Sequence, residues 1–210
     1  MAVVTSATTP IPSAISGVDP QWLTGVLRAF GGITSEATVT NVRAELIALD
    51  TGFSSLLYRV HLTGTDIPSS LIVKLPAASE ARGAMEMLGG YTREVAFYQH
   101  VAGRAPMKTP QVYAARIAPN ATDFILVMED LRDWDNADHL AGLPLDRARQ
   151  CIGELAKLHA WSSDPANSDL VGLFPSMDTD MTRQVLPSVF VLGWQVYRER
   201  TQRRRHHRWF

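Results

Sequence analysis

Apolar and polar residues alternate over much of residues 39–129, and this period of two constrains the fold more than any other feature. The period is typical of strands whose two sides face different surroundings. Turn-forming residues separate neighbouring segments and favour antiparallel pairing. Short apolar or alternating runs predict five strands, at residues 42–48, 55–62, 71–75, 112–117 and 124–128.

Helical spacing of apolar residues replaces this alternation in four places. Residues 91–101 form the predicted helix between the third and fourth strands, and it would pack on the sheet. A helix is also predicted after Asp19-Pro20, with Asp19 as N-cap and Gly31-Gly32 as its end. Residues 144–161 and 192–201 have the same spacing. The order of elements predicts the α+β class, with an antiparallel five-stranded sheet, one packed helix and a helical second part.

Composition suggests four segments along the chain. Residues 1–16, rich in Ala, Thr, Ser and Pro, predict a disordered tail. A sheet lobe over residues 17–131 is followed by a helical lobe over residues 132–201, with an acidic connector at the boundary. Residues 202–210 form a basic tail.

Charge and cysteine content exclude several classes of protein. Six of the 20 basic residues lie within 198–208, whereas 20 of the 21 acids precede them, so the main body is acidic and general attraction to nucleic acid is not expected. The single Cys151 cannot form an internal disulfide. No run reaches the 18 to 20 apolar residues of a membrane helix, and the first 16 residues lack a basic start. We expect a cytoplasmic protein with no membrane or nucleic-acid partner.

Lys74 stands inside the apolar run Leu-Ile-Val-Lys-Leu-Pro, in a chain with 17 Arg but only three Lys. A buried ammonium is costly without a partner. Lys74 is either an edge-strand lysine that reaches solvent, or a group held by a carboxylate to meet an anion. Glu94, on the 91–101 helix, is the candidate carboxylate, although Arg93 could equally take the inward position.

Two further segments could contact a nucleotide. Gly52, Phe53, Ser54 and Ser55 lie at the first predicted hairpin, where backbone N–H groups could cover phosphates. An ordinary hairpin explains them equally well. The last predicted strand runs into the acidic connector through residues 128–131, and free backbone groups there could bind an adenine edge. The alternative is a buried strand followed by a loop.

A hairpin, a strand lysine, a helix glutamate and a strand exit occur in the order of the ATP-binding lobe of the protein-kinase-like fold. The chain resembles the aminoglycoside-phosphotransferase and choline- and ecdysteroid-kinase-like group over about residues 17–200. The resemblance rests on TGFSSLLYRVHLTG, SLIVKLP, YTREVAFYQHVA, TPQVYAA, FILVMEDL and IGELAKLHAWSS.

This resemblance implies the role of each candidate residue. Lys74 would contact the α- and β-phosphates of ATP, and Glu94 would hold it in place. The hairpin of Gly52, Phe53, Ser54 and Ser55 would lie over the phosphates. His159 would serve in packing. The adenine-binding hinge would be the backbone of Met128, Glu129, Asp130 and Leu131.

The catalytic loop of such kinases, His-Gly-Asp followed by four residues and then Asn, is absent from the 210 residues. That loop and a later Asp supply the base and the Mg²⁺ ligands. We therefore predict no catalytic or metal-binding residue here, although Mg²⁺ is expected for the family. The chain would be part of a phosphotransferase acting on an alcohol, incompetent by itself. A frameshift or premature stop near residue 201 would explain the basic tail, and a solvated basic end is the alternative.

Three other interpretations remain open from the sequence. The chain could be a non-catalytic kinase-like module that docks a protein partner. Its Arg- and His-rich tail could bind nucleic acid or an anionic membrane. The connector residues Asp130, Asp133, Asp135, Asp138 and His139 could bind a metal, but they lack the glycine and glutamate of a calcium loop. The apolar stripe of residues 148–156 would be left exposed and would favour self-association.

Overall fold

The computed structural model describes residues 10–47, 54–134, 137 and 141–206. The chain divides into two compact units, one ending at Pro175 and the other beginning at Ser176. The lobe boundary predicted at residues 131 and 132 falls inside the first unit and stays a prediction.

The first unit is built on a five-stranded sheet with the order β1-β2-β3-β5-β4. All neighbours are antiparallel, so the predicted α+β class with an antiparallel five-stranded sheet is confirmed. β5 lies between β3 and β4, and Phe124 to Met128 of this strand are all buried. The strands are β1 (Thr38–Ile47), β2 (Ser55–Thr65), β3 (Ser70–Pro76), β4 (Val112–Ile117) and β5 (Phe124–Glu129).

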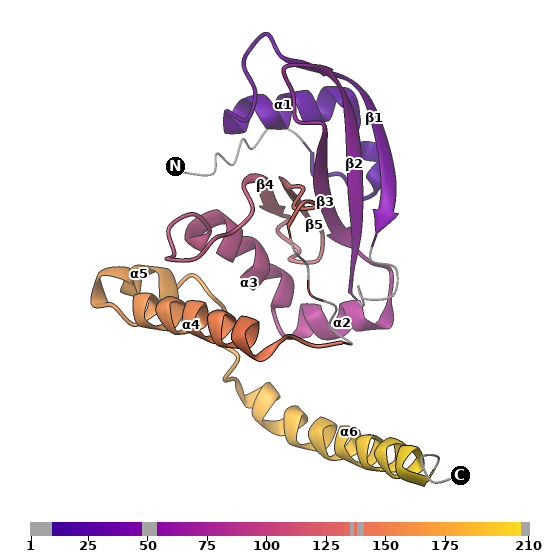
Figure 1. The fold of residues 1–210 in the computed structure, drawn as a ribbon, viewed down its shortest axis with the longest axis vertical. Helices are drawn as coiled ribbons and strands as arrows, with labels where there is room; N and C mark the ends of the chain where they lie inside the picture. Colours follow the sequence, from indigo (N-terminus) through magenta and orange to yellow (C-terminus); the bar gives the residue numbers. More distant parts are fainter. Residues whose placement is uncertain (1–9, 48–53, 135–136, 138–140, 207–210) are drawn as a thin grey trace. The chain divides into compact units, whose positions relative to one another are not determined.

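Helix α1 (Pro20–Phe30) covers one face of the sheet (Figure 1). As predicted, Asp19 caps it by accepting a 2.8 Å hydrogen bond from the Trp22 backbone N–H, and Gly31 ends it in the left-handed conformation at φ 76°. Leu23 and Leu27 pack on core residues of β2, β3 and β5.

The sequence predicts a disordered tail over residues 1–16. Residues 1–9 lie outside the described residues, whereas residues between 10 and 16 contact this core. Ile11 and Ile15 pack against the core, and η1 (Ile15–Gly17) is a short 3-10 turn. The Pro10 carbonyl accepts a 3.1 Å hydrogen bond from the indole of Trp22. Apolar side chains within a polar composition explain this ordered segment.

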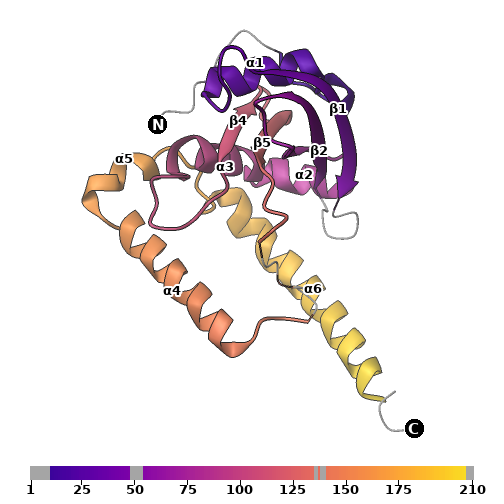
Figure 2. The same ribbon diagram turned by 45° about the horizontal axis from the view of Figure 1, so that its top comes forward.

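Two helices and a π-helical turn link β3 to β4: α2 (Glu80–Met87), α3 (Gly90–Ala96) and η2 (Phe97–Val101). Helix α3 packs on the face opposite α1 (Figure 2). The predicted helix at 91–101 is therefore α3 continued by η2. Helix α2 was not predicted, because Gly83 and Gly89-Gly90 lower the helix propensity of the segment.

The remaining elements are helical. Helix α4 (Leu145–Ser162) lies at the predicted 144–161, and η3 (Pro165–Asn167) and α5 (Ser168–Val171) follow it. The second unit contains α6 (Asp180–His206), which begins well before the predicted residue 192. As expected, the α4 stripe is exposed, with Ile152 at 65% and Leu155 at 45%.

Among the helices of the described part of the chain, none has the length and apolar content that a membrane span requires.

Candidate functional site

The two faces of β3 have different surroundings. Leu71, Val73 and Leu75 point to the core under α1, whereas Ile72 and Lys74 alternate with them and point to the opposite face. We call this opposite face the α3 face, because Tyr91 and Val95 of α3 pack on it. β3 lies between β2 and β5, so Lys74 is not an edge-strand lysine.

Lys74 and Glu94 form an ion pair between Nζ and Oε1 on the α3 face. The buried ring of Tyr91 anchors α3 by stacking on Phe124, with ring centroids 4.7 Å apart. Glu94 follows Tyr91 by three residues and so lies on the same side of the helix, toward the sheet. Arg93 instead donates a 3.4 Å hydrogen bond to the Pro175 carbonyl. The structure thus decides between the two residues in favour of Glu94.

The Lys74 and Glu94 side chains keep contact with solvent, with 20% and 25% of their surfaces exposed. An ammonium has three N–H donors, and Glu94 accepts from one of them. The pair can therefore hold the ammonium in one place while it presents further donors to an anion.

Ser54 and Ser55 lie at the start of β2, close to this pair. Ser55 is buried and stands opposite Pro76, two residues beyond Lys74 in β3. The Ser54 carbonyl accepts a 2.6 Å hydrogen bond from the Tyr91 hydroxyl and a 3.0 Å bond from the Ala77 backbone N–H. Burial raises the pKa of the Tyr91 hydroxyl, which favours its role as a donor. The predicted site residues Gly52 and Phe53 lie outside the described residues.

The exit segment, which we define as Met128 to Leu131, begins in the sheet and ends beyond it. Leu126 stands opposite Lys74, so Met128 lies about 7 Å further along β5. Met128 is buried. The Glu129 backbone N–H donates to the Gln111 carbonyl at 2.8 Å, and the Gln111 N–H donates to the Glu129 carboxylate at 3.0 Å. The structure thus places Met128 and Glu129, the start of the exit segment, on β5, which pairs with the strand that carries Lys74.

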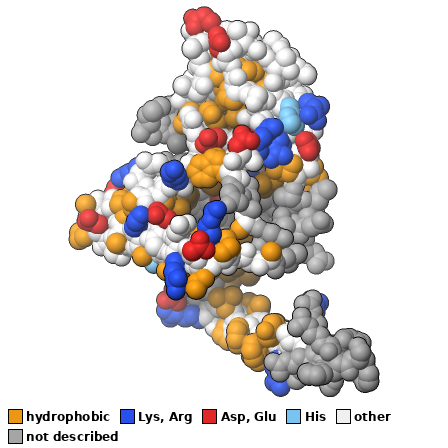
Figure 3. All heavy atoms as spheres, viewed as in Figure 1, with side chains coloured by type: hydrophobic (Ala, Val, Ile, Leu, Met, Phe, Trp, Pro, Cys, Tyr) orange, Lys and Arg blue, Asp and Glu red, His pale blue; other side chains and the backbone are white. Residues whose placement is uncertain are grey.

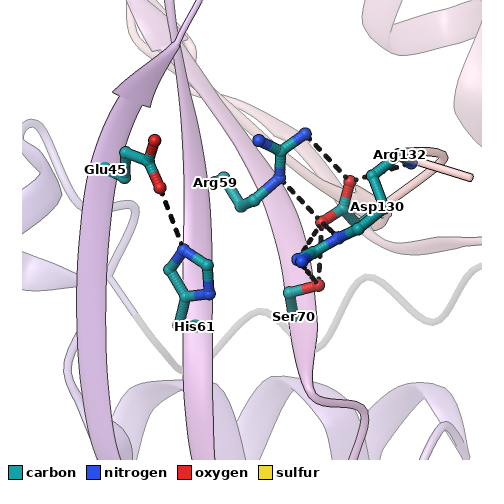
Figure 4. Close-up of polar contacts among 6 residues, drawn as sticks. All are labelled: Glu45, Arg59, His61, Ser70, Asp130 and Arg132. Carbon is teal, nitrogen blue, oxygen red and sulfur yellow. Dashed lines mark hydrogen bonds and ion pairs between the residues drawn. The ribbon is translucent and has the colours of Figure 1, made fainter.

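Asp130 in this segment accepts hydrogen bonds from three side chains (Figure 4). Arg59 Nε lies 2.9 Å and Ser70 Oγ 2.7 Å from its Oδ2. Arg132 Nε also lies 2.9 Å from Oδ2, and Arg132 also contacts Ser70. Burial alone would raise the pKa of the Asp130 carboxyl, but the bonds from Ser70, Arg59 and Arg132 outweigh it and lower the pKa to about 2. Asp130 is therefore a fixed anion in the fold.

Sequence reasoning missed four residues of this region: Tyr91, Arg59, Ser70 and Arg132. Tyr91 could have been found, since an aromatic three residues before Glu94 shares its side of a helix. Arg59 and Ser70 had no local signal, because their partner Asp130 is 71 and 60 residues away in the sequence.

The sequence also points to His159 as a packing residue and to the acidic connector as a candidate metal site. His159 is exposed on α4. Within the described residues, no group of three side chains could hold a metal ion. Asp135, Asp138 and His139 of the acidic connector lie outside those residues.

A protein-family model, the ecdysteroid kinase-like family, matches residues 50–184. The match includes Lys74, Glu94, the exit segment and α4, and it spans more than half of the chain. The chain belongs to the ecdysteroid kinase-like family. This membership makes it a kinase-like phosphotransferase by family and agrees with the resemblance seen in the sequence. Neither a search of curated proteins nor one of solved structures found a match.

Proposed function

We propose that this ecdysteroid kinase-like chain carries the ATP-binding lobe of a phosphotransferase that acts on an alcohol group. The observation that supports the proposal best is the ion pair between Lys74 of β3 and Glu94 of α3. In kinase-type sites, such a pair places the ammonium on the phosphates of the nucleotide.

The α3 face offers a surface suited to each part of ATP. Lys74, held by Glu94, would meet the α- and β-phosphates. The segment around Gly52, Phe53, Ser54 and Ser55 would lie over them. The backbone of Met128, Glu129, Asp130 and Leu131 would bind the adenine edge, and the apolar side chains of Ile72 and Met128 would support the ring.

Turnover is not part of this proposal for the 210-residue polypeptide. Positioning and metal electrostatics supply most of the rate of phosphoryl transfer. The sequence contains no His-Gly-Asp loop, and the described residues contain no cluster that could hold Mg²⁺. The residues present do not fit a Mg²⁺ site, so we derive no step through the metal. We propose that the chain binds ATP without transferring phosphate at a useful rate.

ATP binding can be tested by thermal unfolding in the presence of millimolar ATP, since a ligand that binds only the folded state stabilises it. We expect Lys74→Met to weaken ATP binding about 10- to 100-fold, which corresponds to the loss of a charge-assisted hydrogen bond. Glu94→Gln should weaken it less. Lys157→Met is a matched control, because Lys157 pairs with Glu154 on the surface of α4. Absence of stabilisation of the wild type by ATP would contradict the proposal.

A second candidate function is a non-catalytic kinase-like module that docks a protein partner or a second copy of itself. It is favoured by exposed apolar side chains on α4, and separately by those on α6 (Figure 3). On α6, Phe190 is 70% exposed, and Trp194 stacks on Tyr197 with ring centroids 5.4 Å apart. This candidate would be favoured if ATP does not stabilise the wild type against thermal unfolding and the wild type forms oligomers whose size depends on concentration.

We also propose a cytoplasmic location. That compartment supplies ATP, and it keeps thiols such as the exposed Cys151 reduced.

A further inference from the structure

The exit segment changes its surroundings at Asp130. Up to Glu129 it is held by sheet pairing, since Glu129 stands opposite Leu71 of β3 and donates to Gln111. Beyond this point Arg132 is exposed. A backbone leaving a sheet loses the partners that restrict it, and such segments open more readily than strands. Any restriction of residues 130–132 therefore has to come from contacts outside the sheet.

Side chains from three parts of the chain converge at that point (Figure 4). Arg59 lies in β2 and Ser70 starts β3, and both reach Asp130 at 2.9 Å or less. Arg132 folds back, and its backbone N–H donates to Asp130 Oδ1 at 3.2 Å. Arg59 of β2 stands opposite Ile72 of β3, and Ile72 stands opposite Met128 of β5. The cluster therefore lies beside Met128, where the proposed adenine site begins.

The Asp130 carboxylate is not placed to bind a ligand itself. Its side chain is only 4% exposed, and both of its oxygens accept hydrogen bonds from within the cluster. Any influence on a nucleotide must therefore pass through the backbone that this carboxylate holds.

We infer that Asp130 is a positioning residue for the nucleotide: with Arg59, Ser70 and Arg132, it fixes the backbone of the exit segment in its adenine-binding form before ATP arrives. The inference rests on the proposed function, which it deepens. A segment that is already ordered loses less conformational freedom on binding, so the cluster raises affinity for the base. The phosphates, which Lys74 would bind, are not affected in this way.

The test compares ATP with inorganic tripolyphosphate, which has the phosphates but no base. Both affinities are measured by calorimetry or competition at a temperature where circular dichroism shows each variant to be folded. We expect Asp130→Asn to weaken ATP about tenfold and tripolyphosphate less than twofold. Lys74→Met should weaken both probes.

Asp123→Asn is the matched control. Asp123 directly precedes β5, as Asp130 directly follows it, and it also pairs with an arginine, Arg82, at 3.2 Å. This variant should keep the wild-type ratio of the two affinities. Without nucleotide, amide hydrogen exchange at residues 129–134 should become faster in Asp130→Asn and stay unchanged in Asp123→Asn.

The outcomes separate this inference from the proposed function. ATP affinity within twofold of the wild type in Asp130→Asn, or an equal loss of both probes, would overturn the inference and leave the proposed function standing. A wild type that does not bind ATP would overturn the proposed function. In that case hydrogen exchange alone decides whether Asp130 fixes the segment, and unchanged exchange at 129–134 would overturn that claim too.

Discussion

Replacing Asp130 by Asn should lower the free energy of unfolding by about 2 kcal/mol at pH 7. The pKa of this carboxyl falls from the ordinary 3.8 to about 2 in the folded protein. Each pKa unit corresponds to about 1.4 kcal/mol, so the ionised carboxylate stabilises the folded state by about 2 kcal/mol. With the side chain only 4% exposed, little of this is lost to solvent screening. Asparagine keeps the shape of the side chain and removes its charge.

The same contribution should depend on pH in a defined window. Because the pKa is lower in the folded state, the stabilisation is complete well above pH 4 and is lost as pH falls toward 2. The difference between the wild type and Asp130→Asn should therefore shrink by about 1 kcal/mol between pH 7 and pH 3. For a chain of this length, the pH 7 difference corresponds to a Tm change of about 4 to 8 °C.

Urea denaturation of both proteins, followed by circular dichroism at several pH values, measures this difference directly. Asp123→Asn is the control, since the Asp123 side chain is 42% exposed and its pair with Arg82 should contribute less than about 1 kcal/mol. A difference between the wild type and Asp130→Asn that stays constant from pH 7 to pH 3 would refute the electrostatic account of the cluster.

Three further changes test other parts of the structure. Tyr91→Phe removes the hydroxyl that donates to the Ser54 carbonyl, so it should cost about 1 kcal/mol in urea denaturation; an unchanged midpoint would contradict this. Gly64→Ala would place a Cβ 2.1 Å from the Thr38 carbonyl oxygen, so it should lower Tm by several degrees. A Cβ at Gly83 of α2 has open space, so the control Gly83→Ala should not lower Tm. Ile152→Glu places a charge in the exposed α4 stripe, so it should reduce self-association in sedimentation experiments. Gln150→Glu adds the same charge on α4 outside the stripe and should reduce self-association less. Equal effects of the two variants would refute a role for the stripe.

Local patterns in the sequence were sufficient for much of the fold. The alternation in residues 55–62 and the capping residues Asp19 and Gly31 act over a few positions, so they predicted β2 and the ends of α1. The same holds for Lys74: its apolar neighbours already indicated that it needs a partner.

Weak or distant signals were missed. Helix α2 is not predicted, because glycine lowers the helix propensity of that segment. The polar composition before α1 predicts a tail, although Ile11 and Ile15 pack on the core. In both cases packing on the rest of the fold outweighs the local preference.

The sequence by itself thus determined the strands, most of the helices and the residues that need partners, because these follow from interactions between near neighbours. Only the tertiary structure decided that β5 enters between β3 and β4, that Glu94 and not Arg93 meets Lys74, and that Arg59 and Ser70 hold Asp130. The pairings of β3 with β5, of Lys74 with Glu94 and of Asp130 with Arg59 and Ser70 join residues 20 to 71 positions apart. Contacts at such separations depend on how whole elements pack, which short-range patterns do not encode.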